Sequence, residues 1–270
     1  CPAELQLEMK NLLKLYPILF FLSCADEFVP NNPIDPENPD YIPPIVSITA
    51  GLEAGQLITQ ENLTISYSGN ETSMLFRTRL DSMIWTGWAN ALNTTLDYLD
   101  EGDHQFSVQG KYTTGDTSEI VSLPFTVDAV DGPALMLYPR RQYASQGETI
   151  QFSIMAEEVF NLAGLEIVIE YDPAKVTVMD VNSGTLFSEV GDPIFLHEIA
   201  ESQGRLTITA AVWGDDAPSF TGTQAIAVIG LRIEQSGNIT IDFGNDPIFR
   251  DQNNFEIQVA EAVPGLVVVN

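Results

Sequence analysis

The sequence predicts an all-β protein made of two β-sandwich modules that follow one another along the chain. Short segments in which apolar and polar residues alternate recur from residue 45 to residue 269, and a period of two is typical of half-buried strands. Turn-forming Gly, Pro, Asn and Asp residues separate these segments. Residues 134–269 contain no convincing helical pattern.

The composition favours a soluble acidic protein. The chain has 270 residues, enough for one or two domains, and its 38 acidic and 11 basic residues give a net charge of −27. Nucleic acids and anionic membrane surfaces are bound through basic surfaces, so neither is an expected partner. The simplest interpretation of the acidity is solubility, although it would also attract divalent cations.

No group of residues predicts a catalytic site. The two cysteines, Cys1 and Cys24, lie outside both modules, which excludes a disulfide or a cysteine zinc site within them. The two histidines, His104 and His197, are far apart and belong to no metalloprotease or triad signature. Asp and Glu are so abundant that no particular carboxylate pair stands out, so we expect no enzymatic activity.

Residues 1–24 resemble a bacterial lipoprotein signal peptide. A basic start is followed by an apolar run that is too short for a permanent membrane helix of about 20 residues. The run ends in Phe-Leu-Ser-Cys at Cys24, which resembles a lipobox except for its Phe. We therefore expect Met9 to be the true start, residues 1–8 to lie upstream of it, and Cys24 to be lipidated.

This resemblance implies a secreted protein tied to the bacterial cell envelope through its N-terminal lipid only. Which membrane would hold the lipid stays open. The alternative is a plain signal peptide in which Cys24 is incidental.

Residues 25–44 predict an extended tether. Six prolines recur among Asn and Asp residues, and few apolar residues are available to bury. Such a segment would hold the folded part away from a membrane. The alternative is an arm that packs on the next domain.

Residues 45–128 predict an immunoglobulin-like β-sandwich, because six or seven short strands alternate with turns. Stretches 79–88 and 99–108 also resemble immunoglobulin-like modules of bacterial surface proteins, in which they are structural. The expected strands are 45–48, 63–67, 74–80, 94–99, 104–112 and 120–127.

Three side chains of this module are candidates for function. Trp85 and Trp88 suit a platform on which a sugar ring stacks. The interpretation that we favour is that at least one of them packs between the sheets. His104 precedes an alternating strand, and we expect it to be a hydrogen-bonded turn residue rather than a ligand.

A short connector at residues 129–133, Ala-Val-Asp-Gly-Pro, leads to the second module at residues 134–270. This module predicts a jelly-roll sandwich of nine or ten strands. Stretch 226–234 is largely apolar and is expected to be buried on both faces. The expected strands are 134–138, 149–155, 165–171, 175–179, 194–199, 205–212, 225–234, 239–243, 255–259 and 266–269.

The most informative stretch is 161–173. It predicts a turn at Gly164, which has no Cβ to clash, followed by an alternating strand that Asp172-Pro173 ends. Asn-Leu-Ala-Gly, the strand and Tyr-Asp-Pro together resemble the cohesin domain of bacterial extracellular scaffoldins. The resemblance covers about residues 134–269. Other features that fit it are Gly147-Glu148-Thr149, Val176, Gly184 with Phe187, and Phe249-Arg250-Asp251.

The cohesin resemblance implies that one sheet face docks a small, helical, calcium-loaded module called dockerin. By position, this face would involve the strand that follows Gly164 and the strand at 205–212. For each candidate residue the alternative is an ordinary solvent-facing position, and for Trp213 the alternative is a side chain packed into the core. The candidate partner-binding residues are Glu166, Glu170, Arg205, Thr207, Thr209 and Trp213.

A polar loop near the end of the chain is a candidate calcium site. Asp246, Asp251, Asn253 and Asn254 bring oxygen ligands close together, and Ca²⁺ prefers oxygen ligands. The spacing does not follow the EF-hand pattern. The alternative is an ordinary turn, because Asn and Asp favour turns for backbone reasons.

Two rival functions remain open. Direct polysaccharide binding would need a row of exposed aromatic residues, and Tyr138, Tyr143, Trp213 and Phe220 do not follow strand spacing. The other rival is a structural or adhesion spacer that does not bind dockerin. The sequence shows no internal repeat, so a single cohesin-like module would serve one partner rather than collect many.

Overall fold

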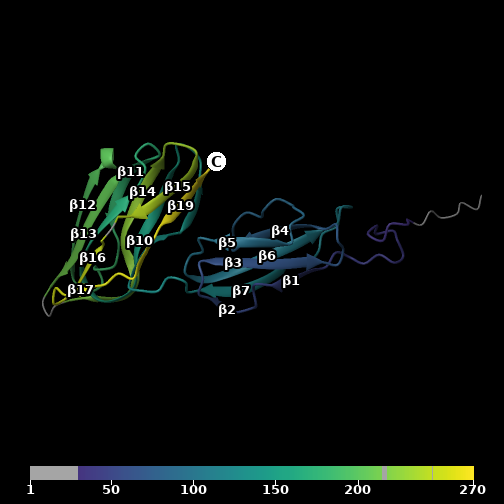
Figure 1. Cartoon of the computed structure of the whole chain (residues 1–270), viewed down its shortest axis with the longest axis horizontal. Helices are drawn as coiled ribbons and strands as arrows, with labels where there is room; N and C mark the ends of the chain where they lie inside the picture. Colours follow the sequence, from purple (N-terminus) through teal and green to yellow (C-terminus); the bar gives the residue numbers. More distant parts are fainter. Residues whose placement is uncertain (1–29, 215–217, 245) are drawn as a thin grey trace, which may run out of the picture. The chain divides into compact units, whose positions relative to one another are not determined.

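The computed structural model describes residues 30–270 apart from 215–217 and 245 (Figure 1). In these residues the regular structure is β-strand, with one short 3-10 helix at Glu201–Gln203, so the all-β prediction is confirmed. The chain divides into two compact units, residues 1–43 and 44–270. No helix in the described ranges has the length and apolar character needed to cross a membrane. Cys24 lies outside the described residues.

Residues 32–40 form a series of tight turns, so the prediction of an extended tether is wrong for this part. Three consecutive units of the form Asx-Pro-Xaa begin at Asn32, Asp35 and Asn38. In each unit the side-chain oxygen of Asx accepts a hydrogen bond from the N–H two residues later, at 2.8–3.3 Å. The backbone carbonyl of Asx accepts a hydrogen bond from the N–H three residues later, at 2.9–3.0 Å. Asx turns and the fixed φ of proline explain the compaction.

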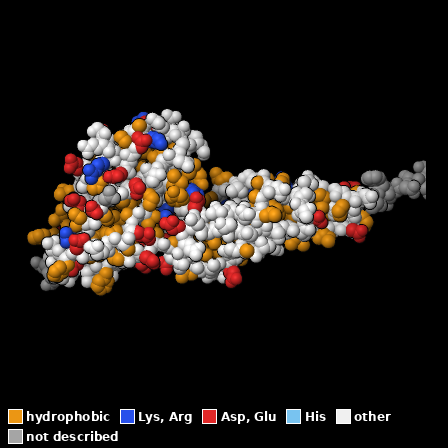
Figure 2. Space-filling model, in the orientation of Figure 1, with side chains coloured by type: hydrophobic (Ala, Val, Ile, Leu, Met, Phe, Trp, Pro, Cys, Tyr) orange, Lys and Arg blue, Asp and Glu red, His pale blue; other side chains and the backbone are white. Residues whose placement is uncertain are grey.

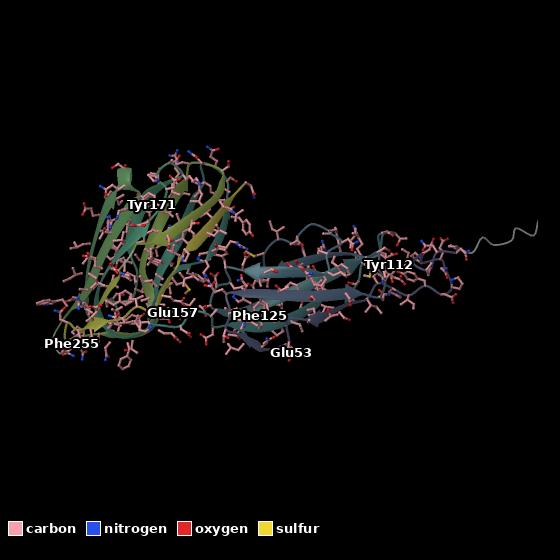
Figure 3. The ribbon with its side chains drawn as sticks, in the orientation of Figure 1. Glu53, Tyr112, Phe125, Glu157, Tyr171 and Phe255 are labelled. Carbon is pink, nitrogen blue, oxygen red and sulfur yellow. The ribbon has the colours of Figure 1, made fainter. Side chains whose placement is uncertain are left out.

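Residues 46–127 form a sandwich of two sheets. One sheet has the order β1-β3-β5 and the other the order β2-β7-β6-β4. Phe106 and Phe125 are buried in the core, and Figure 3 labels Phe125 among these strands. The strands are β1 (Val46–Ala50), β2 (Gln56–Ile58), β3 (Asn62–Gly69), β4 (Leu75–Leu80), β5 (Asn93–Asp97), β6 (Gly102–Lys111) and β7 (Val121–Val127).

Six of these seven strands match the segments expected from the sequence. The strand that the sequence did not predict is β2, a three-residue strand that pairs in parallel with β7. Three residues are too few to show a period of two, so only the long-range pairing reveals this strand. Two sheets of three and four strands fit the expected immunoglobulin-like arrangement.

The second module contains twelve strands that one hydrogen-bonded network connects (Figure 1). The short strands β9, β16 and β18 were not predicted. The strands are β8 (Ala134–Tyr138), β9 (Arg141–Ala144), β10 (Thr149–Glu170), β11 (Val176–Ser183), β12 (Asp192–Ala200), β13 (Arg205–Trp213), β14 (Phe220–Ile233), β15 (Gly237–Phe243), β16 (Ile248–Asp251), β17 (Glu256–Ile257), β18 (Glu261–Val263) and β19 (Gly265–Val269).

The long strand β10 belongs to both layers of this sandwich. Residues 149–157 pair with β14 and β8 in the first layer. Residues 164–170 pair with β13, and β16 joins the same part of β10 on its other edge. Large apolar side chains from both layers, such as Phe152 and Ile208, fill the core between them.

The predicted turn at Gly164 is wrong. The strand continues through this region, and Gly164 has no positive φ; a Cβ added there would come no closer than 3.7 Å to another residue. The left-handed positions are Glu158, with φ of 47°, and Asn161, with φ of 55°. Asn tolerates this conformation better than most residues, so Asn161 rather than Gly164 provides the bend between the layers.

Gly204 fixes the connection between β12 and β13. It has φ of 63°, and its carbonyl accepts a hydrogen bond of 2.9 Å from Tyr171 N–H. A Cβ added at Gly204 would lie 2.0 Å from the Tyr171 carbonyl oxygen and 2.8 Å from Pro173 Cδ. The Tyr-Asp-Pro segment after β10 and the β12–β13 hairpin therefore touch backbone to backbone. Figure 3 labels Tyr171 at this end of the module.

We expect Gly204→Ala to lower the free energy of unfolding by about 3 kcal/mol or more, because a side chain there meets backbone that cannot move aside. The control is Gly237→Ala, which also has a positive φ but has nothing within 4 Å of the added Cβ. We expect it to cost only about 1 kcal/mol, from backbone strain alone. Urea unfolding of both variants measures the difference, and equal losses would contradict the close contact.

Candidate functional site

The outward face of the second layer is the candidate site. It is formed by β12, β13, the second half of β10, and β16, and we call it the β12–β13 face. Strand register aligns its side chains in rows across the sheet. In one row Leu196 lies opposite Thr209, Thr209 opposite Glu166, and Glu166 opposite Ile248. The face is therefore built from four chain segments that the register holds in fixed order.

Large apolar side chains lie at both edges of this face, on β12 and β16, and at the end of β13. Leu196 is 63% exposed and Trp213 is 72% exposed, with Ile194 and Ile248 less so. Figure 2 shows hydrophobic side chains gathered along the edge of the module where Figure 1 draws β12 and β13. These side chains alternate with buried residues of the same strands, such as Ile208. Exposed large apolar residues that gather on one face indicate an interaction surface.

Charged and polar groups lie between the apolar edges, on the central strands β13 and β10. Thr209 Oγ1 donates a hydrogen bond of 3.3 Å to Glu166 Oε2. Arg205 lies opposite Glu170 in the register, and both side chains are exposed. The face therefore offers a partner both apolar contacts at its edges and charged groups of both signs between them.

All six residues that the sequence singled out lie on the β12–β13 face. Their role in binding a partner stays a prediction. The alternative that Trp213 plugs the core is wrong, because its side chain is exposed. Candidate residues that the sequence analysis missed are Ile194, Leu196 and Ile248. The run Ile194-Phe195-Leu196 is apolar at successive positions, so only its pairing with β13 shows which side chains face outward.

Three of the four candidate calcium ligands, Asp251, Asn253 and Asn254, lie in a tight turn, whereas Asp246 lies before β16, so the prediction that all four share one loop is wrong. Asp251 Oδ1 accepts hydrogen bonds of 2.8 Å from the N–H groups of Asn253 and Phe255. Asn254 has φ of 66°, and its N–H donates to the Asp251 carbonyl. Among the described residues, no group of three or more His, Cys, Asp or Glu is placed to hold a metal ion. These contacts fit the turn interpretation, and calcium binding stays a prediction. Figure 3 labels Phe255 at this loop.

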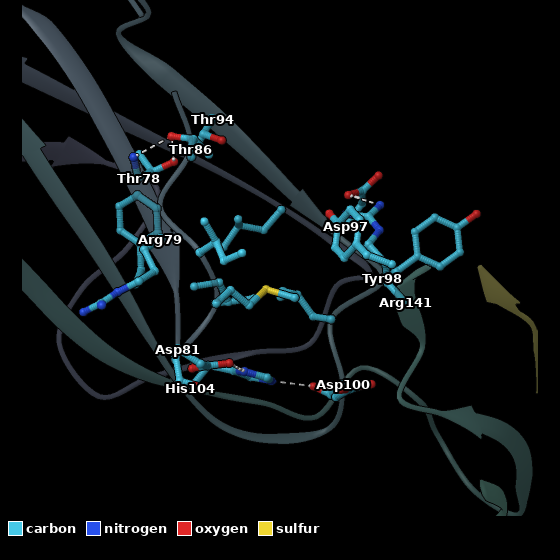
Figure 4. Close-up of a pocket in the computed structure, with 18 of the residues that line it drawn as sticks. Thr78, Arg79, Asp81, Thr86, Thr94, Asp97, Tyr98, Asp100, His104 and Arg141 are labelled. Carbon is cyan, nitrogen blue, oxygen red and sulfur yellow. Dashed lines mark hydrogen bonds and ion pairs between the residues drawn. The ribbon is translucent and has the colours of Figure 1, made fainter. Parts of the chain in front are cut away.

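A cavity of about 780 Å³ is lined by β4, β5, the start of β6 and the loop after β4, together with Arg141, Tyr143 and Asn270 (Figure 4). The ion pair between Arg141 and Asp97, at 2.6 Å, is part of its lining. His104 also lines the cavity. Its Nδ1 lies 2.8 Å from Asp81 Oδ2, and its Nε2 lies 2.8 Å from the Asp100 carbonyl oxygen.

The two partners of His104 explain its charge state. A carboxylate and a carbonyl both accept hydrogen bonds, so only the doubly protonated ring donates to both. Burial lowers the pKa of His104, but the hydrogen bonds to Asp100 and Asp81 outweigh this effect, and the pKa is raised above 6.5. Because both ring nitrogens are engaged, His104 is not placed to accept a proton from a substrate. The prediction that His104 is hydrogen-bonded is confirmed, but the residue lies in β6 and not in a turn.

Residues 140–269 match the family model of the cohesin domain. A search of curated proteins finds no match.

Solved structures that resemble the chain are also cohesins. A type II cohesin domain from the cellulosome of Acetivibrio cellulolyticus is 19% identical, and the match covers 50% of this chain and 94% of that one with a TM-score of 0.44. A non-cellulosomal cohesin from the archaeon Archaeoglobus fulgidus is 15% identical over 51% and 90% of the two chains, with a TM-score of 0.43. A type I cohesin–dockerin complex from Clostridium thermocellum gives 16% identity over 51% and 98%, with a TM-score of 0.43.

We expect the charged form of His104 to stabilise the fold. A raised pKa in the folded state means that this stabilisation is fully present below the unfolded-state pKa of about 6.5 and is lost as pH rises through the folded-state pKa. The free energy of unfolding of the wild type should therefore fall towards that of His104→Gln as pH rises from about 6 to 9. Urea unfolding at several pH values measures the difference.

His197→Gln is the matched control, because it removes the other histidine without touching this cluster. Its unfolding free energy should run parallel to that of the wild type across the same range. A constant gap between the wild type and His104→Gln at every pH would contradict the assignment.

Proposed function

We propose that the cohesin domain binds a protein partner of the dockerin type through the β12–β13 face. The observation that carries this proposal is the exposure of Leu196 and Trp213 on a sheet face. Hydrogen bonds between the strands keep this face rigid. A free surface of this composition loses apolar contact with water when a partner covers it, which favours association. The dockerin class of partner is what the match of residues 140–269 to the cohesin family supports.

The geometry suits a helical partner. A sheet face without a deep groove offers broad contact to the apolar side of a helix, and Leu196, Ile194 and Trp213 provide apolar anchors for it. Thr207, Thr209 and Glu166 lie beside these anchors as hydrogen-bonding groups. Trp and Arg are frequent among the residues that dominate binding energy, which gives Trp213 and Arg205 the strongest expected contributions.

We also propose that the protein is displayed at the bacterial cell envelope through a lipid on Cys24. The support is the apolar run that ends at Cys24, followed by polar residues. The turns of residues 32–40 and the sandwich of residues 46–127 would then stand between the lipid and the cohesin domain. In this arrangement one partner would be held at the cell surface.

Polysaccharide binding by the cohesin domain has less support. Among the four aromatic residues considered for it, Phe220 is buried, whereas Tyr138, Tyr143 and Trp213 are exposed. These three are on β8, β9 and β13, which do not pair with one another, so the register does not align them in the row of rings that stacking on a sugar chain requires. If no dockerin-type module binds, the result would favour a spacer role without partner binding.

We expect Leu196→Asp to weaken binding to dockerin-type modules by roughly thirtyfold or more, corresponding to about 2 kcal/mol, because a charge would be buried against the apolar side of the partner. Trp213→Ala should weaken it by a similar factor through lost contact area. Pull-down with a panel of calcium-loaded dockerin modules, followed by titration calorimetry of the binders, measures both effects.

Met179→Asp is the matched control, because Met179 is 51% exposed on β11 in the other layer. It should leave binding unchanged. Loss of binding with Met179→Asp but not with Leu196→Asp would move the interface to the other sheet. Failure of every dockerin module to bind would favour the spacer role.

A further inference from the structure

Five side chains on the outward face of β4 and β6 form an alternating stack of cations and indoles. Arg79 and Arg77 each place Cζ 4.7 Å from the ring centre of Trp85. Arg77 Cζ also lies 4.6 Å from the ring centre of Trp88, and Lys111 Nζ lies 4.6 Å from the same ring. We call this stack, in the order Arg79, Trp85, Arg77, Trp88 and Lys111, the cation–indole ladder.

The strand register explains the line of cations. Arg77 and Arg79 are two positions apart on β4, so both side chains point to the same face. Lys111 on β6 lies opposite Leu75, two positions before Arg77, and continues the line. Same-face positions on a strand are about 6.8 Å apart, which sets the spacing of Arg77 and Arg79, and Lys111 follows on the neighbouring strand.

A segment beside β4 supplies the indoles. Thr86 N–H donates to the Thr78 carbonyl at 2.9 Å, and Ala89 and Phe76 exchange two backbone hydrogen bonds. This segment therefore runs along the edge of β4 and sets Trp85 and Trp88 against the cations. The favoured prediction that at least one tryptophan packs between the sheets is wrong, because the partners of both rings are cations on the outward face.

The ladder also argues against the sugar platform. Each indole already has two cations within 5 Å of its ring centre, so a sugar ring that stacked there would compete with them. Cations on aromatic faces are stabilised by the ring quadrupole, more so when they are partly shielded from water. The tryptophans thus hold the cations in place instead of offering their own faces to a ligand.

The ladder is a positive region in a strongly acidic protein. The chain has 38 acidic and 11 basic residues, and the ladder contains every Lys and Arg between residues 30 and 139. Among the described residues, no carboxylate forms an ion pair with any of the three. Arg77 donates instead to the amide oxygen of Gln109, through Nε at 3.0 Å and Nη2 at 2.6 Å. The Nε of Arg79 is buried without a hydrogen-bond partner.

We propose that the cation–indole ladder binds an extended acidic polypeptide segment whose carboxylates lie at every second residue. Alternate side chains of an extended chain are also about 6.8 Å apart, which matches the spacing of Arg77 and Arg79 along β4. Because neighbouring groups already fix the cations, binding would immobilise few side chains. The segment would contact the sheet through side chains, since residues 86–89 cover the edge of β4. Because each indole already contacts two cations, a peptide is favoured over an acidic polysaccharide, whose sugar rings would compete for the indoles.

The test uses the full chain and a fluorescent octapeptide of alternating Thr and Glu. Binding is followed by fluorescence polarisation in about 20 mM salt. The variants are Arg79→Gln and Lys111→Gln, at the two ends of the ladder, where each cation contacts one indole and its loss leaves Arg77 between both rings. We expect about threefold weaker binding for each variant and about tenfold for the pair. Binding should also weaken steeply with added salt.

Lys175→Gln is the matched control, because it removes one partly exposed positive charge from the other module. It should leave binding unchanged, and thermal melting checks that all variants fold. A second peptide has the same composition with its glutamates contiguous. The proposal is overturned if the peptide with contiguous glutamates binds as well as the alternating one, or if Lys175→Gln weakens binding as much as the ladder variants. It is also overturned if the wild type does not bind the alternating peptide. Binding of polygalacturonate without binding of the peptide would also overturn it, in favour of an acidic polysaccharide.

Discussion

The second module depends on the backbone hydrogen bonds of β10, because this strand takes part in both layers. Its first half pairs with β14 and β8, and its second half pairs with β13 and β16. Bonds along 22 residues fix the two layers relative to each other, so the core between them has a defined thickness. The position of the β12–β13 face follows from this arrangement, since β13 takes its register directly from β10.

Two local features transmit this constraint to the face. Asn161 adopts the left-handed conformation that lets β10 pass from one layer to the other without ending. Gly204 brings the β12–β13 turn against the carbonyl of Tyr171, just after β10 ends. The residues that carried the cohesin resemblance, Asn161 at one end of the segment and Tyr171 near the other, are thus residues that position the sheet, whereas the candidate partner-binding residues lie between and beside them.

The sequence predicted most strands because a period of two is a local signal. It also placed Glu166, Thr207 and Thr209 on one face, since their neighbours in each strand are apolar. It did not separate inward from outward positions in β12, where apolar residues are adjacent and only pairing with β13 decides. The shared strand β10 was missed for a related reason: a left-handed Asn looks like a turn until the partners of the flanking residues are known.

The tryptophans of the first module were misplaced because burial was inferred from residue type. Trp85 and Trp88 are large and apolar, but their nearest partners are cations that come from β4 and β6. No local pattern links residues 77, 88 and 111, so this arrangement becomes visible only when the strand pairing brings them together. Composition gave a partial hint, since so few basic residues are present in an acidic chain.

The Asx-Pro-Xaa turns of residues 32–40 have a consequence for how such a protein changes over evolutionary time. Within each unit the turn hydrogen bonds join groups no more than three residues apart, so these turns need neither a sheet nor a core to form. The third unit is also tied to the first, because Asn38 Nδ2 donates to the backbone carbonyls of Pro30 and Asn32 at 2.9 and 3.1 Å. Duplication of a three-residue unit would therefore lengthen this segment in steps of three residues while the hydrogen bonds of both sandwiches stay intact.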